Sequence, residues 1–343
     1  MKKAVVVCPG RGTYNKPELG YLARYHGGNE QIAQFDSQRS SQGQPTLLAL
    51  DGAAAYSIEQ HGRGDNASAL IFACSALDFL SIDRRQIDIV AVTGNSMGWY
   101  TALACAGALT LERGFGLANT MGRLMQQHSI GSQLVYPFVD DEWRPDPARR
   151  RALLSLVEDI ASRPGHALWL SIDLGGMVVL AGDRAGLDAF VDAVPPVGGR
   201  YPMRLSNHAG FHCPLQAPVA AEARQRMGVE LLAQPSLPLV DGRGAIWWPH
   251  ASSRDELWAY TLAEQVTVTY DFTRAIAVCA REFAPDLFIV TGPGNTLGGA
   301  VAQAMIQAGW RGMRSKADFS MQQERAAVLA SMGLPEQRAL VLG

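Results

Sequence analysis

The chain lacks several features that mark common protein classes. It has only five cysteines in 343 residues, and none forms a CxxC pair, so we expect reduced thiols in a cytoplasmic protein and no disulfide framework. Lysine and arginine (30) nearly balance aspartate and glutamate (32), and no basic stripe is visible. Nucleic acid and membrane are therefore not expected partners.

Long apolar runs are absent too. No segment reaches the roughly twenty apolar residues that a membrane span needs. The apolar run at 4–7 follows a lysine pair and stops at Pro9 and Gly10, so it predicts a first buried strand and not a signal peptide. Neither GRG at 10–12 nor GPG at 292–294 completes a GxGxxG motif, and no Walker A lysine is present, which argues against a nucleotide-binding loop.

Apolar strand patterns alternate with helical patterns along the chain, which predicts an α/β fold with a large core and a second, smaller unit. Between 134 and 205 the predicted order is β-α-β-β-α-β, the ferredoxin-like arrangement. We therefore expect a discontinuous large subdomain (1–130 and 206–316), an inserted ferredoxin-like small subdomain (131–205) and a helical C-terminal tail (317–343). A helical stretch is also expected from Gln44 to about residue 61.

The segment GNSMG at 94–98 has the form of a nucleophile elbow. An apolar strand at 87–93 precedes it and a helical pattern to about 109 follows, which is the strand-turn-helix order that exposes a serine on strained backbone. A bare GxSxG match also arises by chance in a chain with 35 glycines, so the flanking strand and helix carry the prediction that Ser96 is a nucleophile.

A serine nucleophile needs a base and an oxyanion site. His212 lies where the small subdomain returns to the large one, and His208 precedes it by four residues. Alternatively, the two histidines could bind a metal ion together, but Gly210 between them and the lack of an HExxH motif argue against this. The backbone N–H of Met97, and one from the turn at 9–12, are the expected oxyanion donors.

Together these residues resemble the malonyl-CoA:acyl carrier protein transacylases of fatty-acid and polyketide synthesis. The likeness covers about residues 4–310 and is carried by CPGRG (8–12), QP (44–45), GNSMG (94–98), FHCPL (211–215), Gln265 and GPG (292–294). It implies an α/β-hydrolase-like core with the ferredoxin-like insertion.

The resemblance also implies roles. Ser96 attacks an acyl-CoA thioester, His212 is the base and then the acid, and the carbonyl of Gln265 orients the imidazole. Backbone N–H groups of Met97 and Arg11 bind the oxyanion. The phosphopantetheine thiol of a holo acyl carrier protein then takes the acyl group in a ping-pong order, and no cofactor or metal is required.

Three positions, Met121, Arg11 and Asn95, depart from the family pattern. The expected substrate-binding residues are Met121, Asn95 and Gln44. Met121 occupies the place of the arginine that binds the malonyl carboxylate, which predicts a non-carboxylated acyl group; Arg123, about 200° further round the helix, should not replace it. Arg11 replaces a glutamine. Its side chain either binds an acyl carboxylate from the side of the pocket opposite position 121 or lies at the rim of the pocket near the CoA phosphates. Asn95 replaces a histidine and keeps a hydrogen-bonding group.

Two other functions stay open at this point. A hydrolase of the same fold would release acyl groups from carriers to water. A non-catalytic scaffold would carry a decayed site, although Ser96, His212 and Gln265 together argue against decay.

Overall fold

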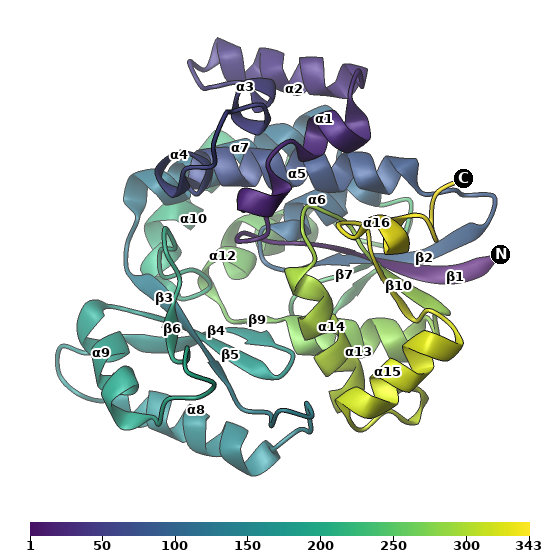
Figure 1. The fold of residues 1–343 in the computed structure, drawn as a ribbon. Coiled ribbons are helices and arrows are strands. Elements are labelled where there is room, and N and C mark those ends of the chain that lie inside the picture. Colours follow the sequence, from purple (N-terminus) through teal and green to yellow (C-terminus); the bar gives the residue numbers. More distant parts are fainter.

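The computed structural model describes residues 1–343 and contains two β-sheets with helices packed against them (Figure 1). The larger sheet has the order β11-β10-β1-β2-β7-β8, parallel except for β8. Its strands are β1 (Lys2–Cys8), β2 (Ile87–Gly94), β7 (Leu239–Val240), β8 (Ile246–Trp247), β10 (Leu287–Val290) and β11 (Leu329–Ser331).

Helices cover both faces of this sheet, as the continuous apolar runs of its central strands require. On one face Val6 and Val92 pack against α5 (Gly64–Ser81), α6 (Gly98–Cys105) and α7 (Leu111–His128). On the other face Val5 and Val7 pack against α13 (Phe272–Glu282) and α14 (Thr296–Gln307). Figure 1 shows these two helical layers above and below the sheet.

The smaller sheet has the order β6-β3-β5-β4-β9. It is formed by β3 (Ser132–Pro137), β4 (Leu168–Leu174), β5 (Met177–Gly182), β6 (Met203–Arg204) and β9 (Tyr270–Asp271). The helices α8 (Pro147–Ala161) and α9 (Arg184–Ala193) bury their apolar sides against one face of it. Strand β9 comes from the C-terminal half and pairs in parallel with β4, so it joins this sheet to the segment that follows Gln265.

The remaining helices are mostly short. They are α1 (Tyr21–His26), α2 (Glu30–Ser41), α3 (Leu47–Asp51), α4 (Ile58–His61), α10 (Ala217–Arg226), α11 (Arg254–Ala259), α12 (Gln265–Thr267), α15 (Lys316–Arg325) and α16 (Pro335–Arg338), with a π-helix at Tyr260–Glu264 and 3-10 turns at Lys16–Glu18, Pro214–Gln216, Val229–Leu231 and Trp310–Gly312.

Two expectations about secondary structure need correction. The helical stretch expected from Gln44 to about 61 is two short helices, α3 and α4, because the chain leaves the helix at Gly52. The segment 317–343 is not helical throughout, since it also supplies the edge strand β11. This segment is fixed to the core by Arg338, whose Nη1 lies 2.5 Å from Oδ1 of the fully buried Asp78.

Candidate active site

Ser96 lies in the tight turn between β2 and α6. Its φ of 55° places it in the left-handed region, which costs a non-glycine residue energy and is typical of functional turns. The end of β1 approaches this turn closely: a Cβ built on Gly10 would lie 2.5 Å from the carbonyl oxygen of Asn95 and 3.4 Å from Cβ of Ser96. Only a residue without a side chain fits at position 10.

His212 is the hydrogen-bonding partner of Ser96. The Oγ of Ser96 lies 2.6 Å from Nε2 of His212, and Nδ1 of His212 lies 2.6 Å from the backbone carbonyl oxygen of Gln265. Because a carbonyl oxygen only accepts, Nδ1 carries the proton and Nε2 is left to accept from the serine hydroxyl. This is the tautomer that a general base for Ser96 requires.

Gln265 presents its carbonyl for a local reason. It begins the three-residue helix α12, directly after the π-helix Tyr260–Glu264, and the last carbonyls of a helix have no partner within the helix. The side chain of Gln265 is also held, because its Nε2 donates to the carbonyl of Ser96 (2.9 Å) and its Oε1 accepts from the hydroxyl of Tyr100 (3.0 Å).

Burial controls the charge of His212. The residue is 2% exposed, and desolvation lowers its pKa to about 4, against a smaller opposing effect of the hydrogen bond to Gln265. The imidazole is therefore neutral at pH 7 and free to take a proton. Like Ser96, His212 has a positive φ (53°), so both halves of the pair sit on strained backbone.

The two expected oxyanion donors belong to segments that meet at the serine turn. Met97 follows the serine, and Arg11 follows Gly10, which packs against the serine turn. No hydrogen bond within the chain uses the backbone N–H of Met97 or of Arg11. Both donors are therefore available to an oxygen at the serine.

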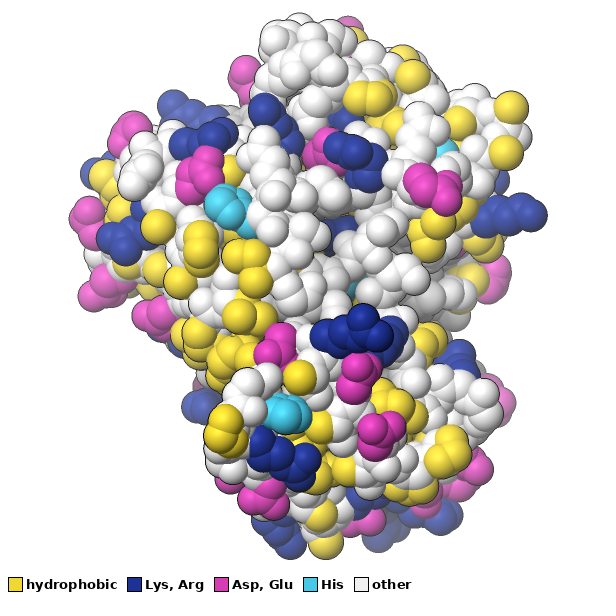
Figure 2. All heavy atoms as spheres, turned by 90° about the vertical axis from the view of Figure 1, so that its left-hand side faces the viewer, with side chains coloured by type: hydrophobic (Ala, Val, Ile, Leu, Met, Phe, Trp, Pro, Cys, Tyr) yellow, Lys and Arg dark blue, Asp and Glu magenta, His cyan; other side chains and the backbone are white.

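A cavity of about 360 Å³ opens beside this turn, between the two sheets. Figure 2 shows the two lobes of the molecule with a waist between them. The large unit contributes Gly10, Arg11, Gly12, Thr13, Asn95, Thr296, Leu297 and Ala300 to the wall, and the small unit and its return segment contribute Val135, Leu174, Met177, Val179, Arg200, Tyr201, Met203, Leu205 and His208. The Oδ1 of Asn95 is buried there without a hydrogen-bond partner.

His208 does not pair with His212 around a metal. Its Nδ1 lies 2.9 Å from Oε1 of Gln133, whose Nε2 donates to Ser171, which in turn donates to the carbonyl of Phe211. This chain of bonds ties the segment before His212 to the small sheet. No group of three or more metal-ligating side chains is present, and no helix is both long and apolar enough to cross a bilayer.

The other predicted substrate residues lie away from this cavity wall. Met121 is fully buried in the core packed against α5 and α6. Gln44 accepts from Nδ2 of Asn119 and lines a separate polar hollow with Arg63 and Asp65. Arg123 donates to Gln42 at the surface, away from Ser96. The roles assigned to these residues stay predictions.

Two tyrosines of the site were not foreseen. Tyr100 holds the side chain of Gln265, and Tyr270 donates to the carbonyl of Gly94 (2.6 Å) while its ring lies 5.4 Å from that of His212. Both are fully buried, and nothing in the sequence distinguishes them from other core aromatics.

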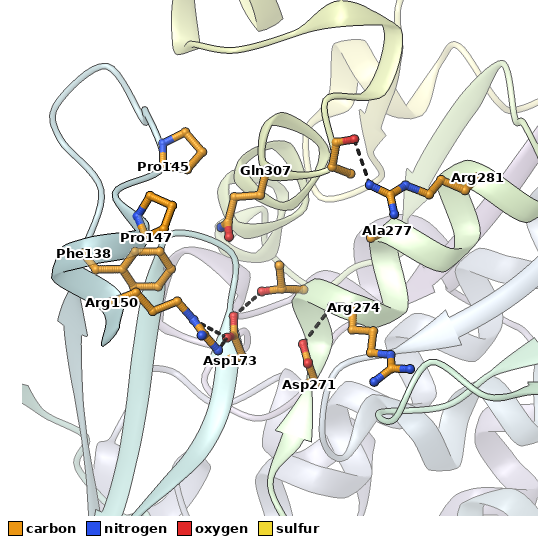
Figure 3. A pocket seen from close by; sticks show the side chains of 12 residues that line it. Phe138, Pro145, Pro147, Arg150, Asp173, Asp271, Arg274, Ala277, Arg281 and Gln307 are labelled. Atoms are coloured by element: carbon orange, nitrogen blue, oxygen red, sulfur yellow. Dashed lines mark hydrogen bonds and ion pairs between the residues drawn. The ribbon is translucent and has the colours of Figure 1, made fainter. Parts of the chain in front are cut away.

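A second hollow, of about 410 Å³, lies at another junction of the two units (Figure 3). Here Arg150 pairs with Asp173 at 2.5 Å, and Thr273 donates to the same aspartate. Figure 3 shows Arg150 and Asp173 turned toward one another. The hollow contains none of the predicted site residues, and the bond from Thr273 to Asp173 joins the two units there.

Comparisons with known proteins point to one group. No protein-family model matches the chain. It is 23% identical over 212 residues to the malonyl CoA-acyl carrier protein transacylase of Salmonella typhimurium, a match that covers 61% of this chain and 63% of that protein, less than two thirds. The corresponding protein of Haemophilus influenzae is 24% identical over 226 residues, covering 65% and 68%.

Solved structures agree with this fold over the whole chain. The malonyl-CoA:acyl carrier protein transacylase of Xanthomonas oryzae superposes with a TM-score of 0.76 at 20% identity, covering 100% of this chain and 98% of that one. The acyl-carrier-protein S-malonyltransferase of Burkholderia pseudomallei gives 0.76 at 19% identity, covering 99% of each. A malonyl-transacylase solved in complex with a type II polyketide acyl carrier protein gives 0.73 at 19%, covering 95% and 100%.

Proposed function

We propose that the chain is a member of the malonyl-CoA:acyl carrier protein transacylase family, which it resembles in sequence and in fold, and that it is an acyl-CoA:acyl carrier protein S-acyltransferase with Ser96 as nucleophile. The observation that carries the proposal is the hydrogen-bonded series Ser96–His212–Gln265, with 2.6 Å at each of its two bonds.

The first half-reaction follows from that series. As Oγ of Ser96 forms its bond to the thioester carbonyl carbon, Nε2 of His212 takes the hydroxyl proton. The carbonyl of Gln265 stabilises the imidazolium, and the N–H groups of Met97 and Arg11 hold the oxyanion. The C–S bond then breaks, the imidazolium returns its proton to the departing CoA sulfur, and an acyl-serine ester remains.

The second half-reaction is the same chemistry with a different thiol. Neutral His212 takes the proton from the phosphopantetheine thiol of a holo acyl carrier protein, whose sulfur attacks the ester. The serine oxygen leaves and recovers the proton, and the acyl group stays on the carrier. The proposed steps use only this chain's residues, acyl-CoA and the carrier, with no cofactor.

The identity of the acyl group depends on which side chains reach it. Met121 offers no charge, which is the basis of the sequence prediction of a non-carboxylated acyl group. That prediction rests on position 121 alone, so a carboxylated acyl group would need its positive charge from another residue.

We extend the proposal to the finer fold description. The strand order β6-β3-β5-β4 with α8 and α9 on one face supports a ferredoxin-like small subdomain at 131–205. The parallel sheet with an elbow serine supports an α/β-hydrolase-like large subdomain at 1–130 and 206–316. Five free, buried cysteines support a cytoplasmic protein.

The test is to incubate the protein with malonyl-, acetyl- and butyryl-CoA and to weigh it intact. We expect an acyl adduct in the wild type and none in Ser96→Ala, which keeps the Cβ and the backbone of the turn. Added holo acyl carrier protein should discharge the adduct and gain its mass. Discharge to water alone would favour the hydrolase, and no adduct from any donor would contradict both enzymatic functions.

A further inference from the structure

Arg11 has an unusual set of partners. Its Nη2 donates to the carbonyl of Gly62 (2.9 Å) and to that of Asn207 (2.8 Å), and its guanidinium carbon lies 5.4 Å from the ring centre of Phe211. No carboxylate of the chain forms an ion pair with it, and the nearest acidic influence is Asp65. The hydrogen bonds and the ring contact of this half-buried guanidinium are therefore all with neutral groups.

The neutral surroundings of Arg11 have an energetic consequence. Desolvation lowers the pKa of Arg11 to about 10, so the side chain is still charged at pH 7. Its Nε is buried without a hydrogen-bond partner, although the residue as a whole is half-buried. A partly desolvated cation without a counterion is unfavourable, and an anion bound beside it would relieve that cost.

Other arginines of the chain are satisfied differently. Arg338 meets Asp78, and Arg150 meets Asp173. Arg39 is fully buried and also lacks a carboxylate, but its Nε, Nη1 and Nη2 all donate to oxygens of the chain. Arg11 is the one whose buried Nε is left over.

The position of Arg11 connects it with the acyl group. It follows Gly10, which packs against the serine turn, and its guanidinium covers Phe211, the residue before His212. It also lines the 360 Å³ cavity together with Asn95. The side chain therefore lies at the wall of a cavity that also contacts Asn95, the residue before Ser96.

An anion near Arg11 has two sources: a carboxylate on the acyl group or a phosphate of the donor. In the donor, the whole pantetheine arm lies between the phosphate and the thioester, so the phosphate is far from the serine. An acyl carboxylate, by contrast, lies only a few bonds from the serine ester. Since Arg11 lies beside the serine turn, the acyl carboxylate fits its position.

We propose that Arg11 binds the carboxylate of a dicarboxylic acyl group, such as malonyl, and is the specificity-determining residue of this enzyme. This rests on the proposed function above. It replaces the non-carboxylated acyl group predicted from Met121 alone, because the charge comes from the turn after β1 and not from α7.

The experiment measures the rate of acyl-enzyme formation by intact mass for malonyl and acetyl donors. Each acyl group is supplied both as the CoA thioester and as the N-acetylcysteamine thioester, which has no phosphate. The variants are Arg11→Gln, Arg11→Lys and, as a matched control, Arg123→Gln on the surface of α7.

We expect the wild type to take malonyl faster than acetyl from both kinds of donor. Arg11→Gln should lower the malonyl-to-acetyl ratio about 10- to 100-fold with both, the effect of losing a charged hydrogen bond. Arg11→Lys should keep part of the preference, and Arg123→Gln should leave the ratio unchanged.

Three results would overturn the proposal: a wild type that prefers acetyl, a ratio that Arg11→Gln does not change, or a ratio that changes only with CoA thioesters, which would indicate phosphate binding. The preference of the wild type is measured without any variant, so the proposal can be overturned even if Arg11→Gln misfolds. Circular dichroism checks the folding of that variant. An absence of adducts from every donor in the wild type would instead refute the proposed function.

Discussion

His212 and Gln265 meet through the main chain: Nδ1 of the imidazole donates to the backbone carbonyl oxygen of Gln265 over 2.6 Å. A backbone oxygen fixes the tautomer of the base without adding a second buried ionised group. The amide side chain of Gln265 has a separate task, since it connects the carbonyl of Ser96 with the hydroxyl of Tyr100.

This division of tasks predicts unequal effects of two substitutions. His212→Ala removes the base, and we expect acylation of Ser96 to fall by about a thousand-fold or more. Gln265→Ala keeps the backbone carbonyl that orients the base and loses only the side-chain hydrogen bonds to Ser96 and Tyr100. We therefore expect the acylation rate to fall by about ten-fold. Stopped-flow release of CoA measures both rates, and equal losses in the two variants would show that the side chain, not the carbonyl, is essential.

The depressed pKa of His212 predicts the acid limit of activity. Only neutral imidazole accepts the serine proton, so activity is present above the pKa and lost as pH falls through it. Because burial lowers this pKa to about 4, the acylation rate should be nearly constant from pH 7 to about 5 and decline below that. A decline centred near 6.5, the ordinary value for histidine, would mean that the site is open to water.

Gly10 should tolerate no side chain. In Gly10→Ala the new Cβ would meet the carbonyl of Asn95 at 2.5 Å, so the serine turn must shift; we expect about 1–3 kcal/mol of lost stability and a large loss of acylation. Gly299→Ala in α14 is the matched control, because nothing lies within 4 Å of its added Cβ. Chemical denaturation measures the stability of both variants, and intact mass measures how fast each forms the acyl adduct. A Gly10→Ala variant with wild-type stability and acylation rate would argue against the close contact.

Removing Arg338 should destabilise the protein from its C-terminal end. Arg338→Met removes the arginine from the fully buried carboxylate of Asp78 and leaves it only its bonds to His26, Tyr21 and Gly292, a loss of about 3–5 kcal/mol for a buried pair. Arg144→Met is the control, since its pair with Asp140 is exposed and worth about 1 kcal/mol or less. Thermal unfolding distinguishes them, and equal melting temperatures would show that the C-terminal segment adds little to the core.

The strand-turn-helix around Ser96 was predictable because its parts are local: an apolar strand, two glycines and a helical pattern lie within one short segment. The alternation of strands and helices in the small unit was predictable in the same way, from local patterns. The failed prediction was also local in origin, since the periodicity from Gln44 to 61 could not reveal that Gly52 ends the first helix. The edge strand β11 is only three residues long, too short for a pattern to indicate.

The sequence by itself determined the elbow serine, the candidate base and the resemblance to a transacylase family, because these depend on short motifs. The tertiary structure alone decided what surrounds them. It brings His212 to Ser96 across 116 positions of sequence and leaves Arg11 beside neutral carbonyls with its Nε unpartnered. Such facts depend on which buried groups find partners when distant segments pack, and residue spacing along the chain carries no record of that.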